Sequence, residues 1–376
     1  MYVIDDGPTG RVPARVLRVV RRSGTVLREQ IVEQTGLSPS TVSRSVQTLV
    51  DLRLLRLRRE LVPSGPKGRP SIPVQVNPGT FALGAVQTGC DGTTVAIADL
   101  SGRVVHHEQH GTARLSGERD GRWLAAALER ATPPDRTLLA VGIVHEELNR
   151  PPGQAVVSAV EKVLDVPVVV ADVVHAGALA EHLLAGQGRS GKTVYLHARH
   201  AIGYVVVIET DGRIVFNDST DLSHFPSGSD QVCSCRRTGC LGVAAGDRSM
   251  VEAAQATGVL EPAVDLDVYA LAADGDVAAR ELLGRRAKLL GSAAAIVRDM
   301  VRHDDLTFIG SAATDTTTRT DLLTAMHDAS SKPVNVDRVS FGHLGHDLPI
   351  AAAAALAVEQ VFVDPVATGD VVSRAG

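Results

Sequence analysis

The 376-residue sequence has no run of about 18 or more apolar residues, which argues against a transmembrane helix. Its first ten residues, MYVIDDGPTG, contain neither a basic segment nor an apolar run, so a secretion signal is not expected. Cysteine is scarce, and four cysteines do not suggest a disulfide framework in a chain of this length. Together these absences predict a cytoplasmic protein with no membrane segment.

What is present is a globular composition with an uneven distribution of charge. The length predicts two or three domains, and the 44% of hydrophobic residues is enough to build a real core. Residues 1–75 carry 13 Lys and Arg against 6 Asp and Glu, whereas the whole chain has 38 against 43. A basic first segment on an acidic body is typical of a polyanion-binding module, although a merely solvated basic surface is the alternative.

The basic segment has the pattern of a helix-turn-helix. Residues 12–22 and 27–34 have the apolar periodicity of helices, and Gly36 lies in a tight turn that needs a left-handed residue. Ser38 is a good N-cap for a third helix over residues 39–49, with Pro39 at its first position. The polar side chains that this helix would direct at phosphate oxygens and base edges are Ser38, Ser40, Thr41, Ser43, Arg44 and Gln47.

A basic strand, turn and strand follow the third helix. The arginines of residues 53–59 precede the turn PSGPKGRP at 63–70 and the extended stretch SIPVQV at 71–76. This pattern is that of a wing, so residues 1–78 are predicted to form a winged helix-turn-helix domain that binds DNA. A small helical bundle with no DNA role is the alternative. The wing residues that we expect to contact DNA are Arg58, Lys67 and Arg69.

The stretch TGLSPSTVSRSVQTLVDLRLL, followed by GRPSIPVQVNPG, resembles the N-terminal region of repressors in the ROK family (repressors, open reading frames and sugar kinases). The resemblance extends along nearly the whole chain. It implies a transcriptional regulator that binds a palindromic or pseudo-palindromic operator in double-stranded DNA as a homodimer or higher oligomer.

Three of the four cysteines lie within eight residues and follow a histidine, in the spacing H-x8-C-x-C-x4-C. One imidazole and three thiolates, from His224, Cys233, Cys235 and Cys240, suit a closed tetrahedral zinc site. The surrounding SHFPSGSDQVCSCRRTGCL resembles the ROK zinc motif, Gly-His followed by C-x-C-G-x-x-G-C-x-E. Four protein ligands leave no open position for water, so we expect a structural Zn²⁺ ion.

From Ala82 onward, strands alternate with helices, which indicates an α/β architecture. The resemblance implies the two-lobed, actin-like (ribonuclease H-like) fold of ROK sugar kinases. We predict a first lobe over 79–190, with a C-terminal helix at about 348–363 packed back on it. The second lobe is predicted over 191–347, with the zinc loop and a dimerisation surface. The threonine run 316–318 is interpreted as a loop.

The resemblance also locates the two phosphate-binding turns of an active kinase, and both differ here. The first turn, Asp-hydrophobic-Gly-Gly-Thr in the family, reads QTGCD over Gln87–Asp91. The missing carboxylate and the acidic Asp91 both disfavour a Mg-nucleotide phosphate. The second turn, Gly-Thr-Gly-Ile-Gly-x-Gly in the family, reads RHAIGYV over Arg199–Val205. Side chains in place of its glycines obstruct the approach of backbone amides to phosphate.

The general base is missing as well. The family carries Glu-Asn-Asp-x-Asn before a helix ending in Ala-Leu-Ala-Glu, which matches Ala178–Glu181. Counting back places Val173 at the base position, and valine cannot accept a proton. Asp172 is adjacent, but neighbours on an extended segment point to opposite sides. We therefore predict a body that is not an enzyme; the alternative is an ATP-dependent sugar kinase with an accessory N-terminal module.

Sugar-contacting positions differ too. The family's Glu-x-Gly-His reads DLSH over Asp221–His224, and the Pro-Gly loop after the strand at 138–144 is replaced by HEE over His145–Glu147. These changes argue against a sugar bound in the family's usual manner. They leave open another small-molecule effector, or none, in which case the body would only dimerise the DNA-binding domain. The candidate effector-binding residues are Asp172, His175, Asp221 and His224.

Overall fold

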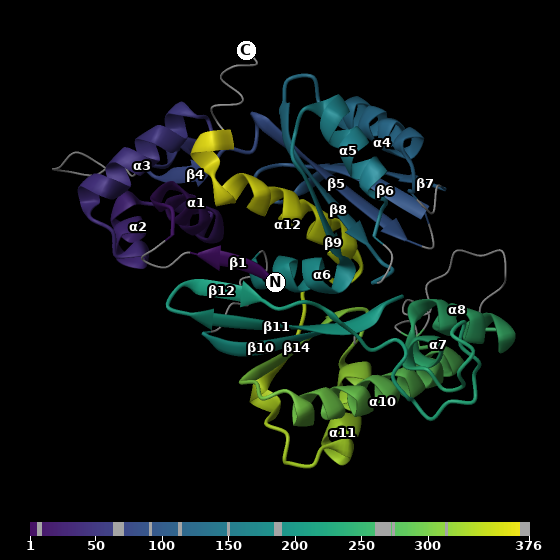
Figure 1. Ribbon diagram of the computed structural model, residues 1–376. Helices are drawn as coiled ribbons and strands as arrows, with labels where there is room; N and C mark the ends of the chain where they lie inside the picture. Colours follow the sequence, from purple (N-terminus) through teal and green to yellow (C-terminus); the bar gives the residue numbers. More distant parts are fainter. Residues whose placement is uncertain are drawn as a thin grey trace.

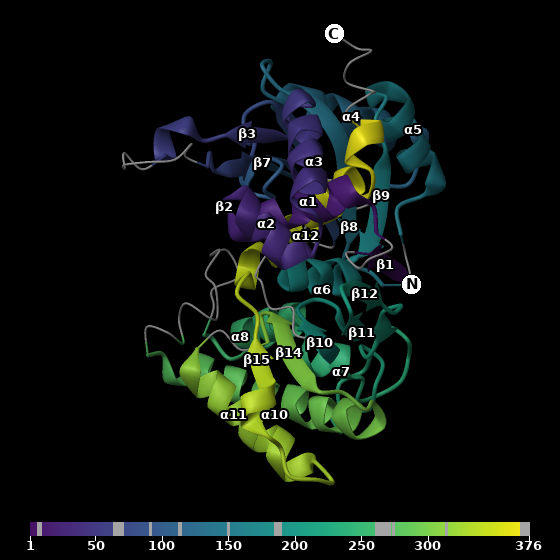
Figure 2. The ribbon, with the colours of Figure 1, turned by 90° about the vertical axis from the view of Figure 1, so that its left-hand side faces the viewer.

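The computed structural model has three sheets, which belong to a small N-terminal unit and two α/β lobes (Figure 1). Seen from the side, the N-terminal unit lies beside the first lobe, and the second lobe lies below both (Figure 2). None of the described helices is both long enough and apolar enough to cross a membrane. The residues that the structure describes are 1–5, 10–62, 71–89, 92–111, 115–148, 151–183, 190–259, 272, 275–312 and 315–368.

The N-terminal unit contains the three predicted helices and a small antiparallel sheet. Pro13 in the first turn of the first helix, Gly36 at φ 66° after the second, and the Ser38 N-cap of the third set the boundaries that the sequence predicted. The strand order is β2-β4-β3, so β4, the last of the three along the chain, lies in the middle, between β2 and β3. The elements are α1 (Val12–Ser23), β2 (Thr25–Val26), α2 (Arg28–Thr35), α3 (Pro39–Asp51), β3 (Leu55–Leu57), the 3₁₀ turn η1 (Arg59–Leu61) and β4 (Val74–Val76).

The first lobe is a five-stranded sheet covered by helices on both faces (Figure 1). Its order is β7-β6-β5-β8-β9, with β5, β8 and β9 parallel and the other pairs antiparallel. The elements are β5 (Phe81–Gly89), β6 (Gly92–Ala98), β7 (Val104–His110), α4 (Glu118–Ala131), β8 (Thr137–His145), α5 (Gln154–Leu164) and β9 (Val168–Asp172).

Two helices cross between the lobes. They are α6 (Val173–Leu183) and the alanine-rich α12 (Leu348–Val363), which packs against α6, β5 and β8. The approach of α12 to β8 is close enough to require a glycine, because a side chain at Gly142 would collide with the backbone of Ala353. The C-terminal helix therefore contributes to the first lobe although it follows the second in sequence.

The second lobe is built on a larger mixed sheet, with order β1-β12-β11-β10-β14-β15 and β13 added beside β11. The threonine run at 316–318 is not a loop, as we expected: Asp315 caps α11, whose first turn these threonines form. The elements are β10 (Gly191–Ala198), β11 (Ile202–Thr210), β12 (Arg213–Phe216), β13 (Thr220–Asp221), α7 (Leu241–Ala245), α8 (Asp247–Ala256), α10 (Val277–Met300), β14 (Asp305–Gly310), α11 (Thr316–Ala329), η2 (Val336–Arg338), β15 (Val339–Phe341) and η3 (Gly345–Asp347).

The first strand, β1 (Tyr2–Asp5), was not foreseen in this sheet. It pairs antiparallel with β12, placing Tyr2 opposite Phe216 and Ile4 opposite Ile214. Residues 1–78 were assigned to one DNA-binding domain, yet the chain starts in the sheet of the second lobe and only then enters α1. The pattern YVID is too short to reveal a partner strand more than two hundred residues away.

One hydrophobic cluster runs from the N-terminal unit into the body. It joins Val16, Leu17 and Val20 of α1 to apolar residues of α6 and α12. Ile4 of β1 belongs to the same cluster and is 1% exposed. The N-terminal unit is therefore packed on the body and does not stand apart from it.

Candidate functional site

Helix α3 buries one face and exposes the other. Val42, Val46 and Leu49 have no exposed surface, while the Ser38 hydroxyl accepts a hydrogen bond from the Thr41 amide at 3.2 Å. The buried stripe fixes which side chains face outward. The candidate DNA contacts on this helix are exposed, with Thr41 half-buried: Ser38, Ser40, Thr41, Ser43, Arg44 and Gln47.

The described part of the wing carries two guanidinium groups on one acceptor. The side-chain oxygen of Gln75, on β4, accepts from Arg56 Nη2 at 2.7 Å and also from Arg58. Arg58 makes an ion pair with Glu60 as well. Arg56 of β3 and Arg58, just after this strand, are thereby held on the same acceptor at the edge of the sheet. The other two wing residues that we singled out, Lys67 and Arg69, lie outside the described residues.

The four predicted metal ligands come together in the loop after β13. Their ligand atoms all lie within 4.8 Å of one another. The Cys235 and Cys240 sulfurs are 3.6 Å apart, and so are Cys233 Sγ and His224 Nδ1. Tetrahedral zinc with Zn–S bonds of about 2.3 Å and a Zn–N bond of about 2.0–2.1 Å requires separations of roughly 3.5–3.8 Å. The donor set and its spacing therefore fit a closed zinc site.

The backbone of this loop is folded by its own hydrogen bonds. The Cys233 amide donates to the Arg237 carbonyl at 2.8 Å, and the Arg236 amide to the Cys233 carbonyl at 2.8 Å. Arg236 has φ 69°, in the left-handed region, at the position where the ROK motif carries glycine. The loop keeps the conformation that glycine favours and tolerates the strain of a larger residue.

At the segment compared above with the family's first phosphate turn, a carboxylate lies against the backbone. Gln87 donates to Glu146 Oε1 at 2.8 Å, and a side chain added at Gly89 would collide with the Glu146 carboxylate. Glu146 belongs to the segment that replaces the family's Pro-Gly loop, and it is 7% exposed. Its charge and position disfavour an anion at this turn. Cys90 and Asp91 lie outside the described residues.

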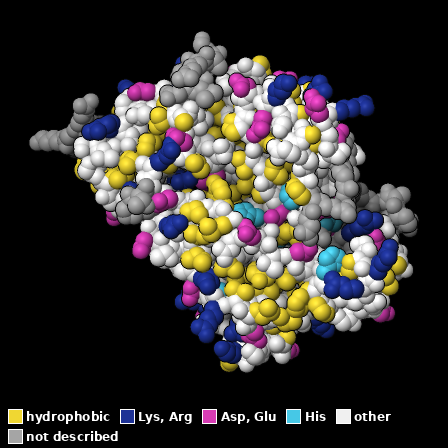
Figure 3. Space-filling model, viewed as in Figure 1, with side chains coloured by type: hydrophobic (Ala, Val, Ile, Leu, Met, Phe, Trp, Pro, Cys, Tyr) yellow, Lys and Arg dark blue, Asp and Glu magenta, His cyan; other side chains and the backbone are white. Residues whose placement is uncertain are grey.

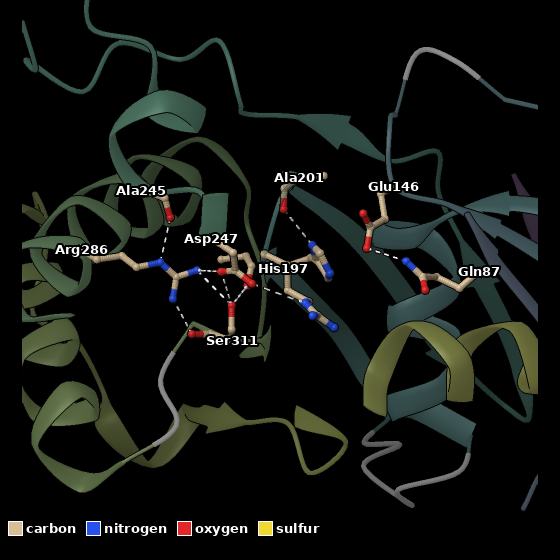
Figure 4. Close-up of polar contacts among 10 residues, drawn as sticks. Gln87, Glu146, His197, Ala201, Ala245, Asp247, Arg286 and Ser311 are labelled. Carbon is tan, nitrogen blue, oxygen red and sulfur yellow. Dashed lines mark hydrogen bonds and ion pairs between the residues drawn. The ribbon is translucent and has the colours of Figure 1, made fainter. Parts of the chain in front are cut away.

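At the second turn, the backbone is covered by a polar cluster (Figure 4). Arg286, which is 1% exposed, donates to Asp247 Oδ1 at 2.7 Å, to the Ala245 carbonyl at 2.7 Å and to Ser311 Oγ at 3.0 Å. Arg199, the first residue of the turn, lies 3.5 Å from Asp247. Burial acts to raise the pKa of Asp247, but Arg286, Ser311 and Arg199 hold that pKa below its ordinary value.

His197 lies between the two turns. Figure 4 shows the Arg286–Asp247 cluster on one side of it and the Gln87–Glu146 pair on the other. Its Nδ1 pairs with the Ala201 carbonyl at 3.0 Å, whereas Nε2 has no hydrogen-bond partner among the described residues. Burial, helped by the nearby Arg199, lowers the pKa of His197 to about 4, so the ring is neutral near pH 7.

The position of the missing base is part of the core. Val173 is 1% exposed and begins α6, so it is not on an extended segment as we expected. Asp172 caps the helix: its Oδ1 accepts from the amides of Val174 at 3.0 Å and His175 at 2.9 Å. Its Oδ2 accepts from Ser219 of the second lobe at 2.8 Å. Asp172 therefore serves as a helix cap and as a hydrogen-bond link between the lobes.

The other candidate effector contacts are also engaged. The His175 ring lies 5.8 Å from the Phe216 ring, and burial lowers its pKa. Asp221 accepts from the Ser223 amide at 2.7 Å, and His224 faces Cys233. In the face shown in Figure 3, histidine and acidic side chains gather along the boundary between the lobes. Whether any of them contacts an effector stays a prediction.

The sequence reasoning missed a buried ion pair between α1 and α12. Arg18 donates to Glu359 Oε2 from Nη2 at 2.9 Å and from Nε at 3.2 Å, and the two side chains are 6% and 1% exposed. A signal for it was present, because Glu359 is the only charged residue in the apolar stretch 348–363. A lone carboxylate there needs a buried partner.

Two family models match this sequence. The model of the ROK family matches residues 141–360, and the model of the MarR family matches residues 7–63. The first match covers more than half of the chain, from β8 through most of α12. The second covers the three helices of the N-terminal unit and the strand β3.

Named proteins and a solved structure are similar over most of the chain or over the body. A transcriptional regulator of Mycobacterium tuberculosis is 29% identical over 388 residues, covering 94% of this chain and 86% of that protein. An N-acetylglucosamine repressor of Escherichia coli is 24% identical over 255 residues, covering 61% and 60%. The crystal structure of a ROK family transcriptional regulator, a homologue of the E. coli MLC protein, superposes with a TM-score of 0.69 at 20% identity, covering 95% of this chain and 98% of that one.

Proposed function

Because this chain belongs to the ROK family, we propose that it is a transcriptional repressor that binds double-stranded operator DNA through its winged helix domain. The observation that carries the proposal is the exposed polar face of α3, on a helix whose opposite face is fully buried. The regulators and the repressor among its relatives support this function.

Different residues of the winged helix would contact different parts of the DNA. Short hydroxyl side chains at the start of α3 suit phosphate oxygens, and Arg44 and Gln47 are long enough to reach base edges in the major groove. Gln47 donates to Asp51 at 2.7 Å, which would hold its amide in place. The wing residues Arg58, Lys67 and Arg69 would contact the backbone of the DNA.

Binding to selected DNA tests this proposal. Genomic fragments retained by the purified protein would be narrowed to one site, and affinity measured at several salt concentrations. We expect Arg44→Ala to lose about 1–3 kcal/mol of affinity for that site, and Arg58→Ala mainly to reduce the salt dependence. Arg119→Ala, an exposed change on α4, is the matched control. Wild-type affinity for the site in Arg44→Ala would show that α3 is not the reader.

We also propose that the repressor acts as a homodimer or higher oligomer. Closed symmetry would match the two half-sites of a palindromic operator. The MLC homologue and the repressor relatives support such an assembly only through their kinship. Sedimentation with and without the selected DNA would measure the number of chains per site.

The metal cluster would hold a structural zinc ion. The donor set of one imidazole and three thiolates, at tetrahedral spacing, supports this assignment, and no ligand position is left for substrate. When bound, zinc would fix the loop between β13 and α7. Elemental analysis of protein purified without chelator should give one zinc per chain.

The body would be catalytically silent. Sugar kinases belong to the same family, but the first phosphate turn here faces Glu146, the second is covered by Arg199 and Asp247, and the base position is a buried valine. Each change disfavours a different part of phosphoryl transfer, which needs a cradle for phosphate and a base for the attacking hydroxyl. No ADP should form with hexoses and amino sugars.

A small-molecule effector would bind, if one exists, where the lobes meet. The candidate contacts Asp172, His175, Asp221 and His224 are already bonded or packed within the protein, which disfavours a sugar held as in the kinases. A thermal-shift screen of sugars, amino sugars and other metabolites would separate an inducible repressor from one that needs no effector.

A further inference from the structure

The winged helix domain is fastened to the first lobe by arginines of α1. Besides the Arg18–Glu359 pair, Arg21 donates to the Leu183 carbonyl at the end of α6 at 3.2 Å. The Arg21 guanidinium also lies 5.4 Å from the centre of the Phe362 ring. These contacts are made by the first helix of the winged helix domain.

The same domain is fastened to the second lobe by β1. This strand makes four residue pairs with β12, and α1 is the next described element along the chain. Tyr2 and Ile4 point to the same face of the strand, because side chains alternate. That face packs on α6, since the Tyr2 ring lies 6.3 Å from the His175 ring. The winged helix therefore has one attachment on each lobe.

The two attachments are linked through α6, which carries His175 beside the Tyr2 ring and packs against α12. The pKa of Tyr2 is raised, first by burial and then by the negative charge of Glu359, while Arg18 acts in the opposite direction. The Tyr2 side chain also packs against the hydrophobic cluster that contains Leu17 of α1 and Val358 of α12, so geometry links the same three segments. Tyr2, Arg18 and Glu359 come from three separate parts of the molecule.

We propose that Tyr2, Arg18 and Glu359 form a joint that couples the position of the winged helix to the relative position of the two lobes. Its consequence for regulation rests on the proposed DNA-binding function. Closely packed contacts of this kind shift between discrete arrangements and do not deform continuously. A change in the angle between the lobes would therefore have to move β1 relative to α12, and with it α1.

The joint lies next to the interlobe boundary. Asp172, the last residue of β9, caps α6 and accepts a hydrogen bond from Ser219 across the lobes. The ring of His175, three residues further on, lies beside the Tyr2 ring. A ligand that altered the Asp172–Ser219 contact would act on the joint through less than one turn of helix. Because coupling is reciprocal, DNA bound to α3 must also change the conformational equilibrium of the second lobe.

Hydrogen exchange on the full-length, zinc-loaded protein tests the joint without DNA. Glu359 lies on the first-lobe side, so Glu359→Gln should accelerate exchange in residues 1–5 and 213–216 by about five-fold or more, relative to strand β8 in its own lobe. Gln360→Ala, the neighbouring change on α12, is the control and should leave these strands unaltered. Equal exchange of residues 213–216 in wild type and Glu359→Gln would overturn the proposal.

A second variant keeps the test decisive if Glu359→Gln does not fold. Arg18→Met combined with Glu359→Leu removes both charges and leaves apolar side chains of similar size, which buried ion pairs tolerate. The joint predicts the same faster exchange at residues 213–216. Unchanged exchange there in the double variant would show that α12 and β12 are independent.

Adding the selected DNA tests the consequence. In wild type, DNA should change the exchange of residues 213–216 by about three-fold or more, although they lie outside the winged helix. In the double variant DNA should still bind, but this change should disappear. If the wild-type protein binds no DNA, the proposed DNA-binding function is wrong. The exchange measured without DNA still tests whether the joint exists. DNA binding with no effect on residues 213–216 would refute the coupling alone.

Discussion

The guanidinium of Arg286 and the carboxylate of Asp247 are 2.7 Å apart, and the arginine side chain is 1% exposed. The pair joins α10 to the start of α8 directly beneath the second phosphate turn. Ser311 Oγ donates to the same carboxylate oxygen at 2.6 Å, so Asp247 has both a counter-charge and a neutral hydrogen-bond donor from distant parts of the chain. This buried cluster lies beside the segment Arg199–Val205, because Arg199 is 3.5 Å from Asp247.

Removing one member of this cluster should be severe. Arg286→Met leaves Asp247 buried without its main counter-charge, and we expect a loss of about 3–5 kcal/mol in the free energy of unfolding, measured with denaturant. Arg248→Met, which breaks an exposed pair on α8, is the control and should cost less than about 0.5 kcal/mol. A similar small loss in both variants would mean that the cluster contributes no stability.

The buried, neutral ring of His197 should make the stability of the fold sensitive to acid. Its pKa is lowered from 6.5 to about 4 by burial. As pH falls below 6.5, the unfolded chain binds a proton that the folded ring rejects, so stability is present above pH 6.5 and is lost as pH falls through about 4. The loss should be on the order of 3 kcal/mol.

Unfolding curves between pH 7 and 4 measure this contribution. His197→Leu should have a shallower decline of stability with acid than wild type, whatever its stability at pH 7. His107→Leu, at an exposed position of β7, should decline in parallel with wild type. Parallel curves for His197→Leu would show that this ring does not titrate on unfolding.

Restoring an acid at the base position should not restore a kinase. Val173→Asp puts a carboxylate at a site that is 1% exposed, so we expect a loss of about 2–4 kcal/mol in stability and no ADP formation. Val173→Ala separates the lost packing from the buried charge and should cost less. ADP formation by Val173→Asp with any hexose would contradict the proposed silence of the body.

Metal removal should loosen one loop first. A chelator, or Cys235→Ser, should increase hydrogen exchange in residues 224–240 and lower the melting temperature, because metal binding contributes to folding. Ser234→Ala, between two ligands, is the matched control. Retention of zinc by Cys235→Ser at one ion per chain would remove Cys235 from the ligand set.

The parts of the fold that could be predicted are those with local signals. Ser38, Pro39 and Gly36 mark helix ends within a few residues. The spacing of His224 and the three cysteines predicts the metal cluster. The strand β1 could not be predicted, because its partner lies more than two hundred residues away and four residues carry no register. The threonines at 316–318 misled for the opposite reason: they are weak helix formers, and the Asp315 cap and tertiary packing override them.

Between the lobes, the sequence indicated which residues of the family's motifs are missing. It did not indicate which side chains occupy their places. That Val173 cannot act as a base follows from its chemistry. That Glu146 faces Gly89, and that Arg286 reaches Asp247, depends on how loops from distant elements converge. Such side chains do not belong to any sequence motif. Only the folded structure therefore identifies them.

The hydrophobic cluster that continues from α1 into α12 bears on how such regulators can be recombined. A DNA-binding domain on a flexible tether can be exchanged for another with little penalty. Here a graft of residues 10–76 from a relative would bring its own α1 surface against this α12. Glu359 would then be buried without a counter-charge unless the graft also supplied an arginine. Chimeras should therefore fold well only when α12 is transferred together with the N-terminal domain, so that these two segments form one exchangeable unit.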